Sequence, residues 1–208
     1  FIDRRGNKYV GSRAYNNAAR NPDNAAVLFK RLMGTSTPVK LPAVNLTMTP
    51  EECSAEVLRA LYGYLPEEIR GDGDTGTVIT VPAAFNQMQK DSTMAAADAA
   101  GLGRVALMQE PVAAVMSVMR QRKNDGVFVV YDLGGGTLDI AIAESIAGRV
   151  NLLAHGGIAM CGGRDFDRIL FDNVVKPWLL DNFDLPEDLA SNPQYKSLRT
   201  IATWAAEK

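Results

Sequence analysis

Short apolar runs that end at turn residues predict the strands of this chain. β-Branched and aromatic residues favour extended structure, whereas glycine, asparagine and proline interrupt it. The run TVITV ends at Pro82 and is typical of a buried strand. Three later runs are joined by glycine turns and predict an antiparallel meander. The strands expected are 77–81, 105–108, 127–132, 138–144 and 149–155.

Helix signals occupy most of the remaining sequence. Thr49 precedes Pro50 and stands three residues before Glu52, the pattern of an N-cap with a capping box, so a helix is predicted from residue 50 to about residue 65. An alanine-rich helix should end at Gly101. The other expected helices are two short pieces within 12–34, broken at Asn21-Pro22; a helix at 111–123, apolar on most faces and expected to be buried; and helices at 164–180 and 194–208. Residues 35–45 are expected to be irregular.

The order of these elements predicts an α/β protein with two lobes, residues 1–122 in the first and residues 123–208 in the second. With 208 residues, 47% of them hydrophobic, the chain is long enough to bury a sizeable core. The chain has 22 basic and 24 acidic residues, so no strong electrostatic field favours nucleic acid or an anionic membrane.

Cysteine and histidine content exclude further classes of protein. Cys53 and Cys161 are far apart and form no CxxC pair, and His155 is the only histidine, so neither a disulfide framework nor a zinc site is supported. The segment FIDRRGNKYV lacks the apolar region of a signal peptide, and no run reaches the roughly 20 apolar residues of a membrane helix. We therefore expect a cytoplasmic protein with no membrane or nucleic-acid partner.

Residues 129–144, VVYDLGGGTLDIAIAE, place three consecutive glycines between two predicted strands. Each glycine in a hairpin costs roughly 0.5–1 kcal/mol relative to alanine, and two suffice for a tight turn, so the third needs another reason. Without Cβ atoms the turn can adopt left-handed dihedrals and direct successive N–H groups at a phosphate, with the Thr137 hydroxyl as a further donor. Asp132 and Asp139 bracket the turn, and a hairpin would bring them together, where hydrated magnesium would fit. The alternative is a hairpin tip with two solvated aspartates.

A second glycine pair, Gly162-Gly163, stands directly before the helix that begins near Arg164. The free N–H groups and the dipole at a helix start bind anions, although a glycine pair in this position also serves as an ordinary helix cap. The sequence contains no GxxxxGK[ST], GxSxG or HExxH pattern, so it supports neither a P-loop protein nor the common hydrolase classes.

Four segments, in this order, resemble the nucleotide-binding domain of the seventy-kilodalton heat-shock chaperones: VITVPAAFNQMQK, AAGLGRVALMQEPVAAV, VVYDLGGGTLDIAI and CGGRDFDRIL. The resemblance covers most of the chain and is weakest at 35–75 and 180–208. It implies the actin-like ATPase (ribonuclease H-like) fold, in which two lobes surround a nucleotide cleft, with a fragment of each lobe present here. It also implies ATP or ADP with Mg²⁺, and K⁺ as a further ion, as cofactors.

The resemblance assigns roles to residues on both sides of the glycine turn. Lys30 matches the lysine that places the attacking water, and Glu110 matches the glutamate that senses the metal and the γ-phosphate. Asp132 and Asp139 match carboxylates that hold the metal ions through water. The residues implied to bind nucleotide are Gly134, Gly135, Gly136, Thr137, Gly162 and Gly163, and those implied to be catalytic are Lys30, Glu110, Asp132 and Thr137.

The resemblance also implies communication with a substrate-binding domain. Pro82 matches the proline that relays nucleotide state, and Lys90 stands where the partner arginine is usual. The implied function is an ATP-hydrolysing chaperone. The implied partners are nucleotide, unfolded client polypeptides, a J-domain co-chaperone and a nucleotide exchange factor.

Several positions depart from the pattern of the family. Lys90 keeps a positive charge but lacks the bidentate fork of arginine. Val112 replaces a hydroxyl residue after Glu-Pro, and the first phosphate loop, Asp-x-Gly-Thr-Thr, does not occur in the chain. The other departures are Ile158 and Ala159 for an Asp-Thr pair, Cys161 for leucine and Arg164 for glutamate. Two alternatives therefore stay open: a pseudo-ATPase or scaffold that binds nucleotide without turnover, and a small-molecule kinase on the same fold.

Overall fold

The computed structural model describes residues 1–70, 76–122 and 125–207. The sequence also predicts a loop at RGDGDTG, residues 70–76, and a turn at residues 123–126; most of that loop and the first half of that turn lie outside the described residues. Helix α1 (Ser12–Arg20) ends before Pro22, which begins a 3₁₀ turn, so the predicted break at Asn21-Pro22 is confirmed. A second 3₁₀ turn spans Phe29–Leu32.

Residues 35–45 are more regular than predicted. Strand β1 (Val39–Leu41) pairs antiparallel with β2 (Leu46–Met48) across a 3₁₀ turn at Pro42–Val44. These strands are only three residues long, which is too short for an alternating pattern to stand out in the sequence. Leu41 is almost completely buried, and this burial holds the hairpin against the rest of the chain.

Helices α2 and α4 form the main apolar core together with a parallel strand pair. Helix α2 (Pro50–Gly63) begins with the predicted capping box, α3 (Glu67–Arg70) follows it, and α4 (Gln87–Ala100) ends at Gly101, whose φ of 76° is left-handed. Helix α4 connects β3 (Thr77–Val81) to β4 (Val105–Gln109). The core comprises Ala55, Ala97, Ala100 and Leu102, packed by Leu58, Tyr62, Ile79 and Val105.

The predicted meander is confirmed. Strands β5 (Gly126–Leu133), β6 (Leu138–Ile146) and β7 (Arg149–Ile158) form an antiparallel sheet in the order β5-β6-β7. The pairing of β6 with β7 shifts between Ile142 and Ala143, which leaves Leu153 as the extra residue of a bulge.

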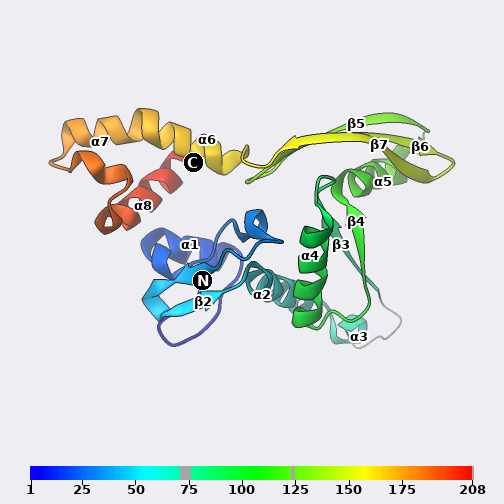
Figure 1. Ribbon diagram of the computed structural model, residues 1–208, viewed down its shortest axis with the longest axis horizontal. Coiled ribbons are helices and arrows are strands. Elements are labelled where there is room, and N and C mark those ends of the chain that lie inside the picture. Colours follow the sequence, from blue (N-terminus) through cyan, green and yellow to red (C-terminus); the bar gives the residue numbers. More distant parts are fainter. Residues whose placement is uncertain (71–75, 123–124, 208) are drawn as a thin grey trace.

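Helix α5 (Glu110–Arg122) covers one face of this sheet and contacts all three strands. Figure 1 shows α5 beneath the sheet. The expectation of a buried helix is wrong, because Met116 and Val118 are 47% and 45% exposed. Val115 of α5 is buried, as are Ala141 and Ala143 of the sheet, whereas Met116 and Val118 face solvent although they are apolar.

The helix predicted at 164–180 is continuous but changes its winding. Helix α6 (Gly163–Leu170) passes through a π-helical turn at Phe171–Val175 into α7 (Lys176–Asn182). Pro177 has no N–H to donate to the carbonyl of Asn173, and its ring crowds that carbonyl, so a wider turn lies just before it. Short 3₁₀ turns at Glu187–Ala190 and Pro193–Tyr195 lead to α8 (Lys196–Glu207).

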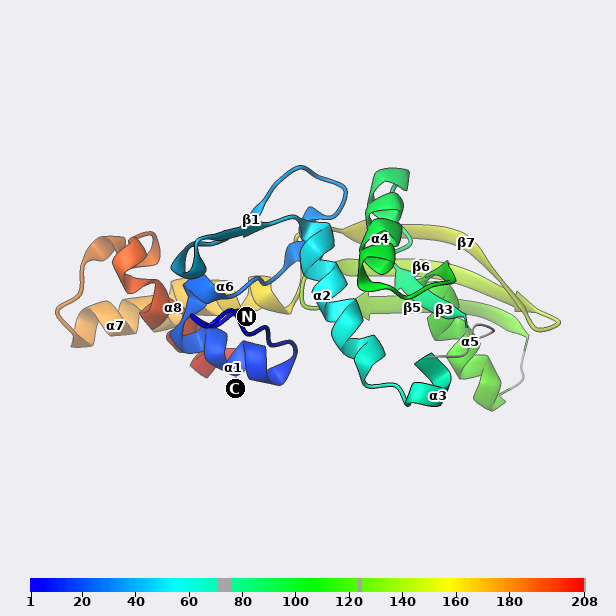
Figure 2. The ribbon, with the colours of Figure 1, turned by 90° about the horizontal axis from the view of Figure 1, so that it is seen from below.

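The C-terminal helices return to the beginning of the chain. Helices α6 and α7 extend away from the end of the β5–β7 sheet, and α8 packs against α1 (Figures 1 and 2). The mixed helix and sheet content agrees with the predicted α/β class, while the boundary near residue 123 stays a prediction. Within the described ranges, no helix is both long and apolar enough to span a bilayer.

Candidate functional site

The glycine turn joins β5 to β6 and packs directly against the start of α6. The Gly134 N–H donates to the Thr137 carbonyl at 3.0 Å, which closes the turn. A Cβ atom on Gly162 would lie 2.5 Å from the Gly136 nitrogen and 2.6 Å from the Gly135 carbonyl carbon, so only glycine fits at this contact.

The predicted left-handed dihedrals are wrong for this turn. None of its three glycines has a positive φ angle. Space explains part of the glycine content instead, because a Cβ atom on Gly136 would lie 3.1 Å from Nε of Arg31. The N–H groups of Gly135 and Gly136 donate to no acceptor in the part of the chain that the structure describes, so both are available to an anion.

The start of α6 is satisfied internally. The N–H groups of Gly163 and Arg164 donate to the carbonyls of Gly134 and Gly135, at 3.0 and 3.1 Å. The Gly162 N–H donates to Oδ2 of Asp165 at 3.0 Å. The prediction of free N–H groups at this helix start is therefore wrong for these residues, since the turn occupies the position in which an anion would accept. A contact of Gly162 or Gly163 with nucleotide stays a prediction.

Arg31 connects the N-terminal part of the chain to this turn. Its Nε and Nη2 atoms donate to the Gly136 carbonyl at 2.9 and 2.6 Å, and Nη2 also donates to Oδ2 of Asp165 at 2.6 Å. The two side chains of this ion pair are only 13% and 15% exposed. The hydrogen bond from Arg31 lowers the pKa of Asp165. We call this contact of Arg31, Gly136 and Asp165 the Arg31 junction.

The sequence analysis missed Arg31 and Asp165. Asp165 stands three residues after Gly162, where an acidic side chain commonly caps a helix, and this spacing was a usable signal. Arg31 follows Lys30 and carries no comparable signal, because a Lys-Arg pair is ordinarily read as solvated surface.

Lys30 is brought to Glu110 from eighty residues away. Nζ of Lys30 lies 2.9 Å from Oε1 of Glu110, whose side chain is 20% exposed. Lys30 and Arg31 share one 3₁₀ turn, which Leu28 precedes with a left-handed φ of 58°. A non-glycine residue in this region carries backbone strain, and such strain gathers at functional sites. The turn directs one cation toward α5 and the next toward the glycine turn.

Asp132 and Asp139 are direct cross-strand partners in the β5–β6 register. Residues paired in this way point to the same face, with Cβ atoms about 4.5–5.5 Å apart. No group of three or more acidic, histidine or cysteine side chains that could hold a metal occurs among the described residues. Two carboxylates fit a magnesium ion that keeps most of its waters and takes further ligands from phosphate, rather than an all-protein cage.

The remaining predicted residues differ in burial and in the contacts that they make. Thr137 is half-buried and its hydroxyl makes no hydrogen bond within the described ranges. Pro82 is buried immediately after β3, and Lys90 is half-buried on α4. Among the residues described, Lys90 makes no ion pair with an acidic side chain. The structure therefore shows no carboxylate that could mediate a contact between Lys90 and the segment of Pro82. Val112 lies in the first turn of α5, two residues after Glu110.

A cavity of about 760 Å³ adjoins the Arg31 junction. Arg31, Arg164, Asp165 and Arg199 are in its wall, together with the aromatic residue Trp204. Its volume lies in the range of about 300–1,000 Å³ that is usual for ligand pockets. The surplus of guanidinium groups favours an anionic ligand.

Comparison with known proteins agrees with the resemblance. The family model described as Hsp70 protein matches residues 35–205. A relative named "Chaperone protein HscA homolog" from Aliivibrio salmonicida is 36% identical over 214 residues, covering 93% of this chain and 34% of the relative. The relatives of that name from Burkholderia cenocepacia and Burkholderia multivorans are each 37% identical, covering 89% and 88% of this chain.

The chain spans about a third of the length of the curated relatives it matches. The Hsp70 family has the actin-like ATPase fold, with which the mixed helix and sheet content is consistent. The family match extends over most of the sequence and includes the glycine turn, Glu110 and the start of α6. The chain belongs to the Hsp70 family.

Proposed function

We propose that this chain supplies phosphate-binding and catalytic side chains for an ATP-hydrolysing nucleotide-binding domain of a chaperone. The observation that carries the proposal is the convergence of three distant segments. Lys30 contacts Glu110, and the adjacent Arg31 contacts Gly136 of the glycine turn. This arrangement gathers cations, carboxylates and free backbone N–H groups around one turn, as phosphoryl transfer to water requires.

Each group has a definite task in this proposal. The N–H groups of Gly135 and Gly136 hold phosphate oxygens, and Thr137 adds a hydroxyl donor. The Lys30 ammonium orients the attacking water and stabilises the charge that develops on the transferring group. Glu110 accepts a hydrogen bond from Lys30 and fixes the direction of its side chain. Magnesium, held by Asp132 and Asp139 through water, would neutralise the phosphate charge when bound.

The cavity beside the Arg31 junction is where we place the rest of the nucleotide. Its guanidinium groups suit an anionic ligand, and its wall includes Arg31, which donates to the Gly136 carbonyl of the glycine turn. Gly162 and Gly163 form the edge between the turn and α6, on the side assigned to adenosine. In this proposal the two parts of the chain, 1–122 and 123–208, are the walls of a nucleotide cleft.

The chaperone role of the relatives leads to further proposals for this chain. We propose that nucleotide state is coupled through Pro82 and Lys90 to the binding of unfolded polypeptides. A J-domain co-chaperone and a nucleotide exchange factor would be partners, potassium a further ion, and the cytoplasm the compartment. The relatives named as HscA homologs are chaperones by name, which supports these proposals.

Nucleotide binding without turnover is the second candidate function. Val112, two residues after Glu110, has no hydroxyl to offer the γ-phosphate side. The Lys30 ammonium also donates to Glu110, and this carboxylate offsets part of the positive charge that Lys30 would offer to phosphate. These two observations support a nucleotide-dependent scaffold as the alternative to the ATPase.

Single-turnover hydrolysis of ATP, measured with magnesium in excess, separates the two candidates. If the chain is an ATPase, Lys30→Ala should slow turnover by about 100-fold or more, since charge stabilisation by one group is worth several kcal/mol. Its affinity for nucleotide should change by less than a few-fold. Lys40→Ala, on the exposed side of β1, is the matched control and should behave as the unmodified chain. Tight nucleotide binding with no turnover would support the scaffold and contradict the ATPase.

A further inference from the structure

A second cavity shares Tyr15, Ala18, Ala25 and Val27 with the wall of the cavity beside the Arg31 junction but has a different character. It has a volume of about 230 Å³, and no residue assigned to the glycine-turn site is in its wall. Most of its wall is aliphatic or aromatic, and the side chains that matter most here are Ile2, Ala14, Phe29, Leu41, Cys53 and Val57. Burial raises the pKa of the Cys53 thiol to about 11, so the thiol stays neutral and contributes an apolar surface. The interior therefore suits an uncharged, apolar group.

One end of this cavity meets a polar groove. Lys8, Tyr9, Val10 and Glu56 belong to the walls of both spaces, so the groove lies directly beside the apolar interior. The groove has a volume of about 420 Å³ and is lined further by Arg13, Arg59 and Tyr64.

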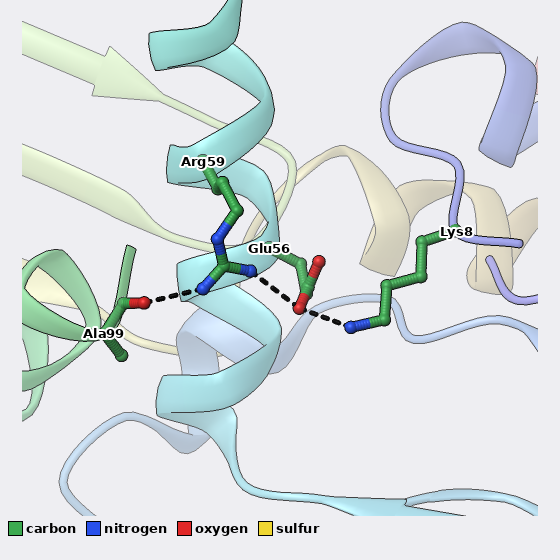
Figure 3. Close-up of polar contacts among 4 residues, drawn as sticks. All are labelled: Lys8, Glu56, Arg59 and Ala99. Atoms are coloured by element: carbon green, nitrogen blue, oxygen red, sulfur yellow. Dashed lines mark hydrogen bonds and ion pairs between the residues drawn. The ribbon is translucent and has the colours of Figure 1, made fainter. Parts of the chain in front are cut away.

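A network of charges around α2 forms part of the wall of the groove. Oε1 of Glu56 accepts hydrogen bonds from Nζ of Lys8 at 2.6 Å and from Nη1 of Arg59 at 2.8 Å. Arg59 also donates to the Ala99 carbonyl at the end of α4, at 2.6 Å. Figure 3 shows Glu56 between the two cations, with Arg59 extended toward Ala99. These contacts fix the positions of the charges at the mouth of the cavity.

The mouth carries an excess of positive charge. Three cationic side chains, Lys8, Arg13 and Arg59, line the groove against the single carboxylate of Glu56. The Arg13 guanidinium stacks over the Tyr9 ring, 4.2 Å from its centroid, and makes no ion pair with an acidic side chain in the described part of the chain. One carboxylate cannot neutralise three cations, so an anionic group that approaches the mouth is attracted.

From this juxtaposition we propose that the chain binds a small amphiphilic carboxylate, with its alkyl chain in the apolar cavity and its carboxylate at Arg13 and Lys8. Apolar cavities of roughly 150 Å³ take a benzene-sized guest, so a space of 230 Å³ accepts a medium-length alkyl chain. The polar head remains in the groove, where it keeps solvent and meets the cations. Octanoate is the probe.

Chain length provides the first test. Each methylene that enters the cavity contributes about 0.8 kcal/mol, which is a factor of roughly four in affinity. The affinity of the 208-residue chain for carboxylates should therefore rise about fourfold per methylene from butanoate to octanoate, with one site per chain. It should level off once the alkyl chain is longer than the cavity. A rise that continues through dodecanoate, with several molecules bound, would show adsorption to exposed apolar surface and overturn the proposal.

Variants locate the site. Ala14→Leu fills the cavity from α1 with a residue of good helix propensity, and we expect it to reduce octanoate binding at least tenfold. Ala95→Leu makes the same change at an exposed position of α4 and should leave binding unchanged. Ala14→Leu should melt at or above the temperature of the unmodified chain, which excludes misfolding as the cause. Unchanged octanoate binding by a folded Ala14→Leu chain would overturn the proposal.

The head group is tested by comparing octanoate with octanol. Arg13→Gln should weaken octanoate binding about five- to tenfold and leave octanol binding unchanged, and Glu56→Gln should strengthen octanoate binding because it removes the competing carboxylate. Arg149→Gln, at the exposed start of β7, is the control for loss of one positive charge. Equal affinities for octanoate and octanol, with no effect of Arg13→Gln, would overturn the role of the charged mouth. These titrations contain no nucleotide, so their outcome is independent of the proposed ATPase.

Discussion

The contact between Gly162 and the glycine turn is the tightest one at the candidate site. The Gly162 backbone is extended, so its requirement for glycine comes from space and not from an unusual dihedral angle. Beside it, Arg31 donates to the Gly136 carbonyl and to Asp165. The missing Cβ atom of Gly162 and the hydrogen bonds of Arg31 therefore fix the position of the glycine turn.

Gly162→Ala should disrupt the turn. The added methyl would meet the Gly136 nitrogen and the Gly135 carbonyl carbon at about 2.5 Å, and neither backbone group can move without displacing the other. We expect a loss of 1–3 kcal/mol in unfolding free energy, as in other overpacked sites, and nucleotide affinity at least tenfold weaker. Urea unfolding and calorimetry measure the two effects. Gly156→Ala, where an added methyl meets nothing within 4 Å, should be nearly neutral, and equal effects of the two substitutions would contradict this explanation.

The Arg31 junction should make stability depend on pH. The folded-state pKa of Asp165 lies below its ordinary value because of the hydrogen bond from Arg31. A carboxyl with a lowered pKa stabilises the fold above its unfolded pKa of about 3.9, and this contribution is lost as the pH falls through the lowered value. The difference in unfolding free energy between the unmodified chain and Asp165→Asn should therefore be larger at pH 7 than at pH 3. A difference that does not change with pH would contradict the ion pair.

At the residue scale, the sequence predicts a chemistry for the glycine turn but not the contacts that surround it. The residue types of Asp132, Asp139 and the glycine turn indicated a phosphate or metal site from their spacing alone. The hydrogen bonds of Gly163 and Arg164 to the turn could not be predicted, because they depend on how β7 delivers α6 to that position. Arg31 was missed for the same reason: its partners are more than a hundred residues away.

Individual elements were predictable where their signals are local. The capping box of α2, the left-handed end of α4 and the pairing of Asp132 with Asp139 all follow from short patterns. The exposure of α5 depends on what covers the helix, and the π-helical turn depends on Pro177. The periodicity of the sequence alone predicted neither. β1 and β2 were too short to detect.

Thr49→Ala should destabilise α2 by about 1 kcal/mol. The Thr49 hydroxyl accepts the Glu52 N–H at 3.1 Å, and the Glu52 carboxylate accepts the Thr49 N–H at 2.8 Å. Removing the hydroxyl leaves the Glu52 N–H without its capping acceptor, at the usual cost of an N-cap. Thr49→Ser keeps the hydroxyl and should restore most of the loss. Denaturant unfolding measures both variants, and equal stabilities for Ala and Ser would contradict a capping role.

At the scale of the whole molecule, one face of the β5–β7 sheet is apolar and uncovered by described residues. Helix α5 covers the other face (Figure 1). On β5 the exposed residues alternate along the strand, and Val129 and Tyr131 are 71% and 63% exposed. The exposed apolar side chains of the sheet face are Val127, Val129, Tyr131, Leu133, Ile140, Ile142 and Ile158.

This sheet face should make the 208-residue chain prone to association. Contiguous apolar surface of this kind binds hydrophobic dyes and promotes self-association. We expect Val129→Lys with Tyr131→Lys to reduce dye fluorescence several-fold and to shift sedimentation toward the monomer. Leu61→Lys changes an exposed apolar residue of α2, outside this sheet, and is the control. If the double variant behaves as the unmodified chain does, this face is not the associating surface.

Among the described residues, two ion pairs connect the beginning of the chain to its C-terminal part. Lys196 of α8 pairs with Asp23, but these side chains are 42% and 49% exposed, so solvent screens the pair and its contribution is small. The Arg31 junction is less exposed and includes the glycine turn itself. This long-range arrangement could be anticipated only through the family resemblance, because no local pattern connects residue 31 with residue 165.

The central claim is that the glycine turn with Asp132 and Asp139 binds nucleotide phosphate together with magnesium. Calorimetric titration of the chain with ADP, with and without magnesium, tests it most directly. The account predicts one site per chain, magnesium-dependent affinity, and at least a tenfold loss in Asp132→Asn. A folded chain that releases no heat with ADP, or one that binds ADP equally well without magnesium and with Asp132→Asn, would contradict it.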